Sequence, residues 1–330
     1  MDGLRGVQGD GGGAVMALLP IPSDKAAWHA LRAKHIGASE VAALFNMQAA
    51  FQPGIYALWM DRAGRVPLPP VEIERAKWGL LLEDAIAAGA AEAHGWDIQP
   101  GRYASHPSGV GATLDRIIAS DPNEQGPGAL ELKNVDMLQT LRGKAWAGEP
   151  PMHVLLQLQA QLLATGFTWG AIAWLVGGNE LRMLRFKAKP AVQREIEKRA
   201  RAFWQSIAED QPPQPDGSDA TYAALLALLP DADEDDEPAD LRGDNEAEAA
   251  AADYLRGAAM AKEGKALTDA ARNVLLSKIG DARWAKTNAA TVSVARVAGT
   301  PSRPANPGEI IKGRAASVRI TLKAYEEAEV

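Results

Sequence analysis

The hydrophobic positions in the first two thirds of the chain change their period several times, which predicts a mixed α/β domain over residues 17–210. Three short helical patterns come first, at residues 26–36, 39–46 and 55–64. A longer helical pattern covers residues 74–94 and carries apolar residues at the i, i+3, i+4 and i+7 spacing of a buried stripe. The stripe consists of Trp78, Leu81, Leu82, Ala85, Ile86 and Gly89. We expect this long helix to bury that stripe against a core.

Strand-like runs follow the long helix. The segments GVGATLDRIIAS (residues 109–120) and ALELKNV (residues 129–135) are both apolar and short. The segment DPNEQGPG between them is rich in residues that favour turns. We therefore expect these two runs to pair as a hairpin.

The rest of this domain adds a helix, a second hairpin and a terminal helix. Residues 150–166 form a helical pattern with Pro near its start and Gly just past its end. The runs at 171–178 and 181–188 predict a hairpin that closes the sheet, and residues 192–210 predict a terminal helix.

The last third of the chain has a different character. Residues 211–248 are Pro-rich and then acidic, and we expect them to be a linker. Within it, residues 231–248 contain ten carboxylates and one arginine, a local charge of −9 in a chain of net charge −7. Residues 249–330 predict an accessory module, in which an Ala-rich helix precedes the alternating strands TVSVARV and SVRITLK. The Gly-rich residues 1–16 predict a disordered tail without the apolar segment of a signal peptide.

Composition excludes several classes of site. The chain contains no cysteine, which rules out disulfides, iron–sulfur clusters and thiolate zinc sites. Its five histidines show no zinc-binding spacing, and no phosphate-binding P-loop motif is present. No apolar run approaches the roughly 20 residues that cross a membrane, so we expect a cytoplasmic protein. Most of the nine tryptophans lie in apolar patterns, and Trp284 is the best candidate for stacking on a base.

Four residues predict a metal-dependent site. Glu131 and Lys133 are two apart on a predicted strand, so they project from the same face. Glu131 can hold a divalent cation, and Lys133 can position an attacking water. The hairpin would bring Asp115 beside Glu131, and Glu83 could face the same point from the long helix. Each of these residues taken alone is more often a solvated surface residue or a turn residue. It is the order in which all four occur along the chain that indicates a metal site.

A glutamine-rich helix follows the Glu131 strand. Gln157 and Gln161 are four residues apart and share one helix face, while Gln159 lies between them in sequence. Two explanations account for these residues equally well. They form the polar flank of a helix, or they orient a water molecule or a phosphate oxygen.

These motifs together resemble a known family. The segments HALR, ASEVAALF, WGLLLED, ATLDRII, LELK and LLQLQAQLLATG occur in this order across residues 28–210. They are similar to lambda exonuclease and the YqaJ-type viral recombinases, a branch of the PD-(D/E)xK nucleases. The resemblance implies a central mixed sheet flanked by helices. It implies Mg²⁺, or Mn²⁺ in its place, held by Asp115, Glu131 and the Leu132 carbonyl. Glu83 would be a further acidic ligand and Lys133 the catalytic lysine.

The resemblance also implies a function: 5′→3′ digestion of double-stranded DNA during phage-type recombination, in the cytoplasm of a bacterial host. A single-strand annealing protein is the implied partner, and a ring-shaped homotrimer is the implied assembly. An endonuclease or repair nuclease on the same fold, and a non-catalytic DNA-end-binding scaffold, are the alternatives. The acidic linker and accessory module have no counterpart in lambda exonuclease, so the trimer does not transfer directly.

Two further residues match the family's pocket for a 5′-terminal phosphate. Ser39 looks like the N-cap of a short helix, whose free N–H groups favour an anion. Arg32, on the preceding helix, would add a bidentate donor. An ordinary helix cap and a surface arginine explain the same residues, so both interpretations remain open. Gln159 and Gln161 are further candidates for DNA contacts.

Overall fold

The structure is a computed structural model that describes residues 18–68, 74–142, 146, 148–229, 239–299, 303–304, 310–311 and 317–324. The chain divides into two compact units, Met1–Ala232 and Asp233–Val330, which are described in turn. The predicted disordered tail, residues 1–16, lies outside the described residues. Among the helices of the described ranges, none is both long and apolar enough to cross a membrane.

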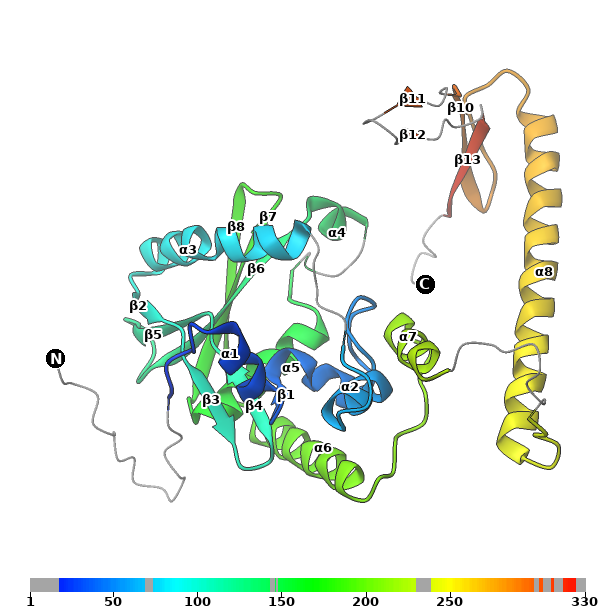
Figure 1. Cartoon of the computed structure of the whole chain (residues 1–330). Helices are drawn as coiled ribbons and strands as arrows, with labels where there is room; N and C mark the ends of the chain where they lie inside the picture. The colour runs from blue at the N-terminus through cyan, green and yellow to red at the C-terminus, as the bar shows by residue number, and fades with distance from the viewer. Residues whose placement is uncertain are drawn as a thin grey trace. The chain divides into compact units, whose positions relative to one another are not determined.

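A five-stranded mixed sheet forms the centre of the first unit (Figure 1). Its order is β2-β5-β6-β7-β8, with β6 and β7 parallel and the other neighbours antiparallel. The strands are β2 (Asp97–Pro100), β5 (Arg116–Ser120), β6 (Gly128–Val135), β7 (Trp169–Val176) and β8 (Glu180–Lys187). The predicted hairpins β5–β6 and β7–β8 are confirmed, as is the mixed α/β class with helices on the sheet. The parallel pair requires a long crossover, which contains α4 (Met137–Arg142) and α5 (Met152–Thr165).

Two helices cover the two faces of this sheet. The helix α3 (Glu74–His94) packs on one face, where Leu130 and Leu132 of β6 are buried. The helix α5 packs on the other face through Val154, Leu158 and Leu162. Because side chains alternate along a strand, Glu131 and Lys133 belong to the α5 face of β6.

The opposite side of α5 is also buried. Its residues Leu156, Ala160 and Ala164 pack into a second hydrophobic cluster. The elements around it are the 3₁₀ helix η1 (Ala38–Phe45), α2 (Ile55–Arg62), α6 (Pro190–Ala208), and a small sheet of β1 (Ile36–Gly37), β3 (Tyr103–His106) and β4 (Val110–Thr113). The helix α1 (Lys25–Arg32) precedes β1 in the chain. The helix α5 is therefore the central helix of the unit.

The long helix has the predicted bounds but not the predicted buried stripe. Trp78 and Leu81 are 50% and 60% exposed, whereas Ile86, Ala87 and Ala90 are buried. Only the second half of α3 therefore packs closely on the sheet. In its first half, Leu82 is partly buried against the same core, whereas Trp78, Leu80 and Leu81 are exposed.

The second predicted helix also differs in type. Residues 38–45 form a 3₁₀ helix, and its N-cap residue is Gly37. The prediction that Ser39 is the N-cap is wrong, because Ser39 lies inside the helix. The carboxylate of Glu40 accepts a hydrogen bond of 2.7 Å from the Gly37 N–H and takes over the capping role.

The predicted linker contains a helix that belongs to the first unit. The helix α7 (Asp219–Leu228) buries Thr221 and Ala224, and it packs against α2. Just before it, the Tyr56 N–H donates to the Asp216 carboxylate at 3.4 Å. The linker therefore cannot begin at residue 211, and its most acidic part, residues 230–238, lies outside the described residues.

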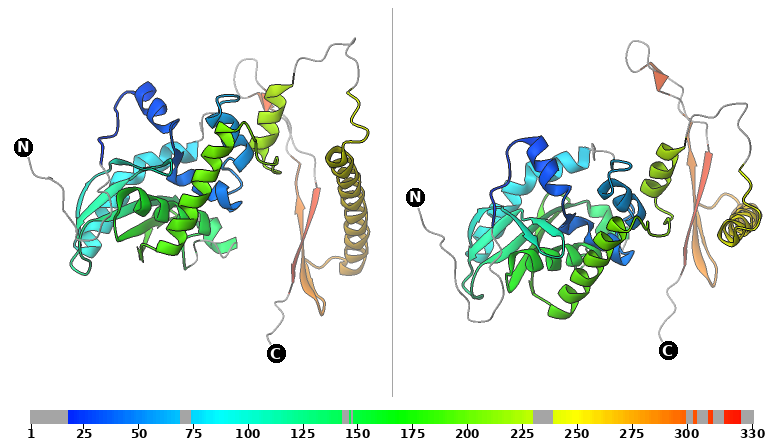
Figure 2. Two further views of the ribbon diagram at one scale, coloured as in Figure 1. Left: turned by 90° about the horizontal axis from the view of Figure 1, so that it is seen from below. Right: turned by 60° about the horizontal axis from the view of Figure 1, so that its bottom comes forward.

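The second unit contains a long helix and a sheet, as the sequence predicts. The helix α8 (Asn245–Ile279) begins at the cap residue Asp244, inside the range predicted as linker. The strands β10 (Ala290–Val297) and β13 (Ser317–Ala324) pair antiparallel over their full length, and they lie side by side in Figure 2. The strand β9 (Trp284–Lys286) pairs with the other edge of β10, and β11 (Arg303–Pro304) pairs with β12 (Ile310–Ile311).

We expect a chain ending at residue 232 to fold, and one ending at residue 215 to be less stable. The shorter chain lacks α7 and therefore exposes the apolar surface of α2 that Ala224 covers. The loss should be about 2 kcal/mol, which lowers the melting temperature by roughly 4–8 °C. Thermal unfolding followed by circular dichroism measures the difference. Equal melting temperatures would show that α7 contributes nothing to the first unit.

Candidate active site

The strand β6 carries a charged pair beneath α5. Glu131 is fully buried, and the ammonium group of Lys133 donates a hydrogen bond to Glu131 Oε1. The side chain of Lys133 is 31% exposed, so this lysine connects the buried carboxylate with the surface. The same-face prediction for these two residues is confirmed.

Two glutamines of α5 complete the surroundings of Glu131. Gln157 Nε2 donates to Glu131 Oε1 at 2.6 Å, and Gln161 Nε2 donates to Glu131 Oε2 at 2.5 Å. Because residues four apart share one helix face, both amides reach the same carboxylate. Both oxygens of Glu131 therefore have donors, as a buried carboxylate requires.

Asp115 lies at the bend between β4 and β5. Its Oδ2 accepts a hydrogen bond of 2.8 Å from the Leu132 N–H. Arg116 and Leu130 are the last paired residues at one end of the β5–β6 register, and Asp115 is the residue directly before Arg116 in the chain. The β5–β6 hairpin thus brings Asp115 next to Glu131 in the sheet, as predicted.

The charges of this cluster shift one another's pKa values. Burial raises the pKa of Asp115 well above its ordinary value, and the charge of Glu131 raises it further. Burial alone would lower the pKa of Lys133, but the charges of Glu131 and Asp115 outweigh it, so that pKa is raised. The lysine therefore stays protonated at neutral pH, whereas the ionised form of Asp115 is destabilised.

Glu83 approaches the cluster from the α3 side of the sheet. Its pKa is raised, chiefly by burial and in part by the charge of Glu131, while Arg116 opposes both effects. A guanidinium nitrogen of Arg116 lies 3.9 Å from a Glu83 carboxylate oxygen, and the same guanidinium contacts Asp84. Glu83 is thus within electrostatic reach of Glu131, and Arg116 is a neighbouring cation that the sequence did not single out.

The donor set suits a hard cation that keeps part of its water shell. Within the described residues, three or more acidic or histidine side chains do not converge into a preformed metal cage. Mg²⁺ needs no such cage, since it commonly binds one or two carboxylates and keeps several waters. Two observations fit this mode. The charge of Glu131 raises the pKa of Asp115, so a cation would relieve the repulsion between them, and the buried Gln161 Oε1 has no hydrogen-bond partner among the described residues.

The Leu132 carbonyl is also placed to contribute. The N–H and C=O of a strand residue point to the same side, and the Leu132 N–H points to Asp115. The carbonyl therefore faces the side on which β5 has already left the ladder. Asp115, Glu131 and this carbonyl are the groups that would hold the cation.

Gln159 lies apart from the cluster. Its Nε2 donates to the Lys187 carbonyl at 2.9 Å, and its Oε1 accepts from the Lys189 N–H at 2.8 Å. Both ends of this buried amide are therefore used to join α5 to the end of β8. Of the three glutamines, only Gln157 and Gln161 reach Glu131, and we leave Gln159 out of the proposed site.

Arg32 and Ser39 form a separate region at the start of η1. Arg62 is almost fully buried and donates to Glu40 at 2.5 Å, whereas Arg32 is 40% exposed and lies 3.5 Å from the same carboxylate. The Arg32 guanidinium also lies 5.8 Å from the ring centroid of Trp28. Neither Glu40 nor Arg62 was predicted from the sequence, although Glu40 is the third residue of the helix, where a glutamate commonly completes a capping box.

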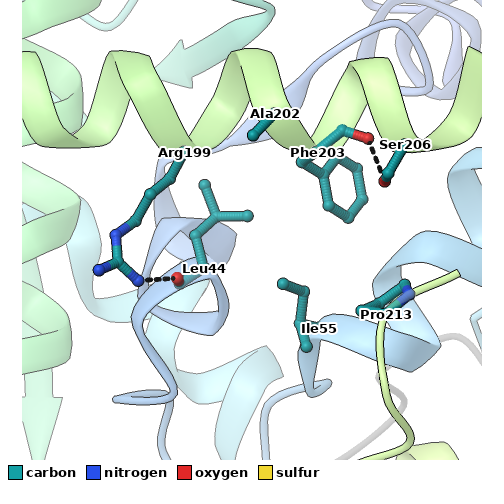
Figure 3. Close-up of a pocket in the computed structure, with 7 residues that line it drawn as sticks. All are labelled: Leu44, Ile55, Arg199, Ala202, Phe203, Ser206 and Pro213. Carbon is teal, nitrogen blue, oxygen red and sulfur yellow. Dashed lines mark hydrogen bonds between the residues drawn. The ribbon is translucent and has the colours of Figure 1, made fainter. Parts of the chain in front are cut away.

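A pocket of about 240 Å³ lies elsewhere in the first unit (Figure 3). Apolar side chains of η1, α2 and α6 line it, together with Arg199, which donates to the Leu44 carbonyl at 2.8 Å. None of the carboxylates or glutamines described above lines it. The pocket is therefore not the candidate site.

The first unit is similar to known proteins. The sequence profile of the family described as YqaJ-like viral recombinase domain matches residues 27–168. A *Bacillus subtilis* (strain 168) protein described as "Uncharacterized protein YqaJ" is 27% identical over 205 residues, which cover 60% of this chain. The chain spans 61% of the length of that relative.

Solved structures of an alkaline exonuclease are also similar. They are LHK-Exo from *Laribacter hongkongensis* and LHK-Exo in complex with dAMP, at 19% and 20% identity and TM-scores of 0.44 and 0.45. Each match covers 62% of this chain and 98% of the other.

We expect Asp115→Asn to stabilise the metal-free protein at neutral pH. The folded-state pKa is raised, so ionisation above the unfolded value of about 3.9 costs stability as the pH rises. Removing that charge should raise the melting temperature in EDTA by roughly 2–4 °C, or about 1 kcal/mol.

Asp121→Asn is the matched control with the opposite expected sign. Burial alone would raise the pKa of Asp121, but hydrogen bonds from Asn123, Arg185 and Trp96 outweigh it and lower that pKa. Its ionised form therefore stabilises the fold, and Asp121→Asn should lower the melting temperature by roughly 4–8 °C. Destabilisation of both variants would contradict the repulsion that we assign to Asp115.

Proposed function

We propose that the chain is a metal-dependent deoxyribonuclease of the YqaJ-like viral recombinase family, whose domain model matches residues 27–168. It hydrolyses double-stranded DNA from its ends, in the 5′→3′ direction, and leaves 3′ single-stranded tails. Its biological setting is phage-type recombination.

The observation that carries this proposal is the Glu131–Lys133 pair of β6 with Asp115 beside it. A buried carboxylate, a protonated lysine and a second carboxylate meet where two strands of the sheet separate. Burying these charged groups without pairing each of them lowers the stability of the fold. Catalysis on a phosphodiester would explain why the chain keeps them together.

A bound Mg²⁺ would lower the pKa of a water and neutralise charge on the scissile phosphate. The chain's own part is to hold the reacting groups. Gln157 and Gln161 fix Glu131 from α5, so its carboxylate keeps one orientation. Lys133 carries its proton at the partly exposed end of the cluster, where it can donate to the attacking water or to a phosphate oxygen.

Two other functions would use the same residues. An endonuclease or repair nuclease would share the chemistry but would not require a DNA end. A DNA-end-binding scaffold would share the fold without cleavage. The intact set of Glu83, Asp115, Glu131 and Lys133 favours an enzyme, and the shape of the DNA substrate distinguishes the two enzymes.

We expect the protein to digest end-labelled linear duplex DNA with Mg²⁺ or Mn²⁺, and to leave covalently closed circular DNA intact. EDTA should abolish cleavage, and Ca²⁺ should support it poorly because its looser coordination suits in-line attack badly. Lys133→Ala should reduce the rate by roughly 10²–10⁴-fold while the protein still folds and binds DNA.

Lys187→Ala is the matched control for that substitution. Lys187 is an exposed lysine of β8 in the same sheet, and its ammonium group contacts Glu124. Its loss should leave the rate unchanged. Near wild-type cleavage by Lys133→Ala would refute the catalytic assignment, and cleavage of closed circles would favour the endonuclease.

The direction of digestion depends on a 5′-phosphate site at Arg32 and Ser39. Glu40 carries a negative charge there, but the buried Arg62 is its close partner. Arg32 makes only the longer contact and is more exposed, so it can turn to a terminal phosphate. The phosphate would gain charge-assisted hydrogen bonds that a hydroxyl cannot make.

We expect faster digestion of 5′-phosphorylated ends than of 5′-hydroxyl ends. The difference should be about 1.5–3 kcal/mol, or roughly ten- to hundredfold in initial rate. Arg32→Ala should remove most of this preference and leave slow hydrolysis in place. Arg65→Ala is the control, because the Arg65 side chain is equally exposed at 40%. Equal rates on both ends in the wild type would remove the basis for the 5′→3′ direction.

The partners follow from the resemblance alone. A single-strand annealing protein would receive the tails, and a ring-shaped homotrimer would thread the DNA in the cytoplasm of the bacterial host. The contacts of the described residues bear on neither, so both remain predictions.

A further inference from the structure

The sheet of the second unit has two chemically different faces. In the register, Ser293 pairs with Trp284, and Thr291 pairs with both Lys286 and Lys323. Residues directly opposite each other in antiparallel strands share a face. An aromatic residue, a lysine and two hydroxyl residues of β9 and β10 therefore share one face of this sheet.

The other face is apolar. Val292 of β10 is only 1% exposed, and its register partners are Ala285 and Leu322. Alternation along β9 and β10 thus assigns Ala285, Val292 and Val294 to this face and Trp284, Lys286, Thr291 and Ser293 to the other. On the polar face, Trp284, Lys286 and Ser293 are exposed.

Trp284 presents its ring on this polar face. Its side chain is 60% exposed, and the Lys286 ammonium group lies 5.9 Å from the ring centroid. Lys286 is itself exposed. An indole ring next to a flexible cation offers a flat surface for stacking and a positive charge at its edge.

The surrounding sequence is strongly basic. Residues 283–324 contain eight Lys or Arg and one acidic residue, a local charge of +7 in a chain whose net charge is −7. The polar face of β9 and β10 thus lies within a strongly basic segment of the chain.

We propose that this face of β9, β10 and β13 binds single-stranded DNA. Its positive charge matches the phosphate backbone, and Trp284 supplies a platform on which an unpaired base can stack. Duplex DNA keeps its bases stacked inside the helix, so they are not free to stack on Trp284. An acidic peptide matches the positive charge but has no bases to stack on this ring. The proposal does not rest on the nuclease function, because binding is measured without a divalent cation.

The test is fluorescence anisotropy of a labelled oligothymidylate of about 15 nucleotides with the full chain in EDTA. Trp284→Ala should weaken binding by roughly five- to hundredfold, the range that stacking of one base provides. Trp284→Phe should retain most of the affinity, because it keeps an aromatic ring. Lys286→Ala should reduce the slope of log affinity against log salt by about 0.7, as the loss of one phosphate contact requires.

Tyr254→Ala is the matched control, since Tyr254 is an aromatic residue of the same unit, on α8, with 78% exposure. It should bind as the wild type does. Should Trp284→Ala fail to fold by circular dichroism, the Trp284→Phe and Lys286→Ala variants decide the outcome. Photocrosslinking to 5-iododeoxyuridine DNA in the wild type should label the peptide that contains Trp284.

Three results would overturn the proposal. The first is unchanged affinity in Trp284→Ala, or in Lys286→Ala where the first variant does not fold. The second is an equal loss of affinity for duplex and single-stranded DNA in Trp284→Ala, which would leave only a general basic patch. The third is competition by polyglutamate as effective as that by unlabelled oligothymidylate, which would point to an acidic protein segment.

Discussion

The burial of the Glu131 carboxylate in the middle of the sheet sets the arrangement around it. An ionised carboxylate without water needs donors for both oxygens. Lys133 and two glutamines of α5 supply them. This requirement fixes the rotation of α5 about its axis. Once Gln157 and Gln161 face the strand, Leu158 and Leu162 lie on the sheet, and Leu156 and Ala160 pack against η1. One charged group therefore couples two hydrophobic clusters.

That coupling explains why the site can be both buried and reactive. Asp115 and Glu131 repel each other, and Lys133 offsets only part of the repulsion. The packing of α5 against the sheet on one side and η1 on the other holds these groups together despite the electrostatic cost. A site of this kind lowers stability and favours a bound cation, which is a common compromise in enzymes.

Local patterns predicted the parts of the fold that depend on local physics. The strands β7 and β8, the bounds of α3 and the pairing of β10 with β13 all follow from periodicity and turn residues. Burial did not follow, because it depends on distant partners: α3 covers the sheet only with its second half, so Trp78 is exposed. The helix α7 was hidden by the Pro-rich and acidic composition around it. In the site, helix spacing predicted the shared face of Gln157 and Gln161. It could not reveal that Gln159 binds the backbone at Lys187, or that Arg62 and Glu40 meet across 22 positions.

The charge distribution shows why net charge is a poor guide to a protein of this kind. At physiological salt, charges farther apart than about 8–10 Å are largely screened from each other. An approaching DNA strand therefore responds to the surface within that distance and not to the sum of −7. Residues 231–248 carry −9, whereas residues 283–324 carry +7. Separating these charges along the chain keeps the protein acidic overall while one segment of it remains basic. The acidic composition is thus compatible with binding to nucleic acid.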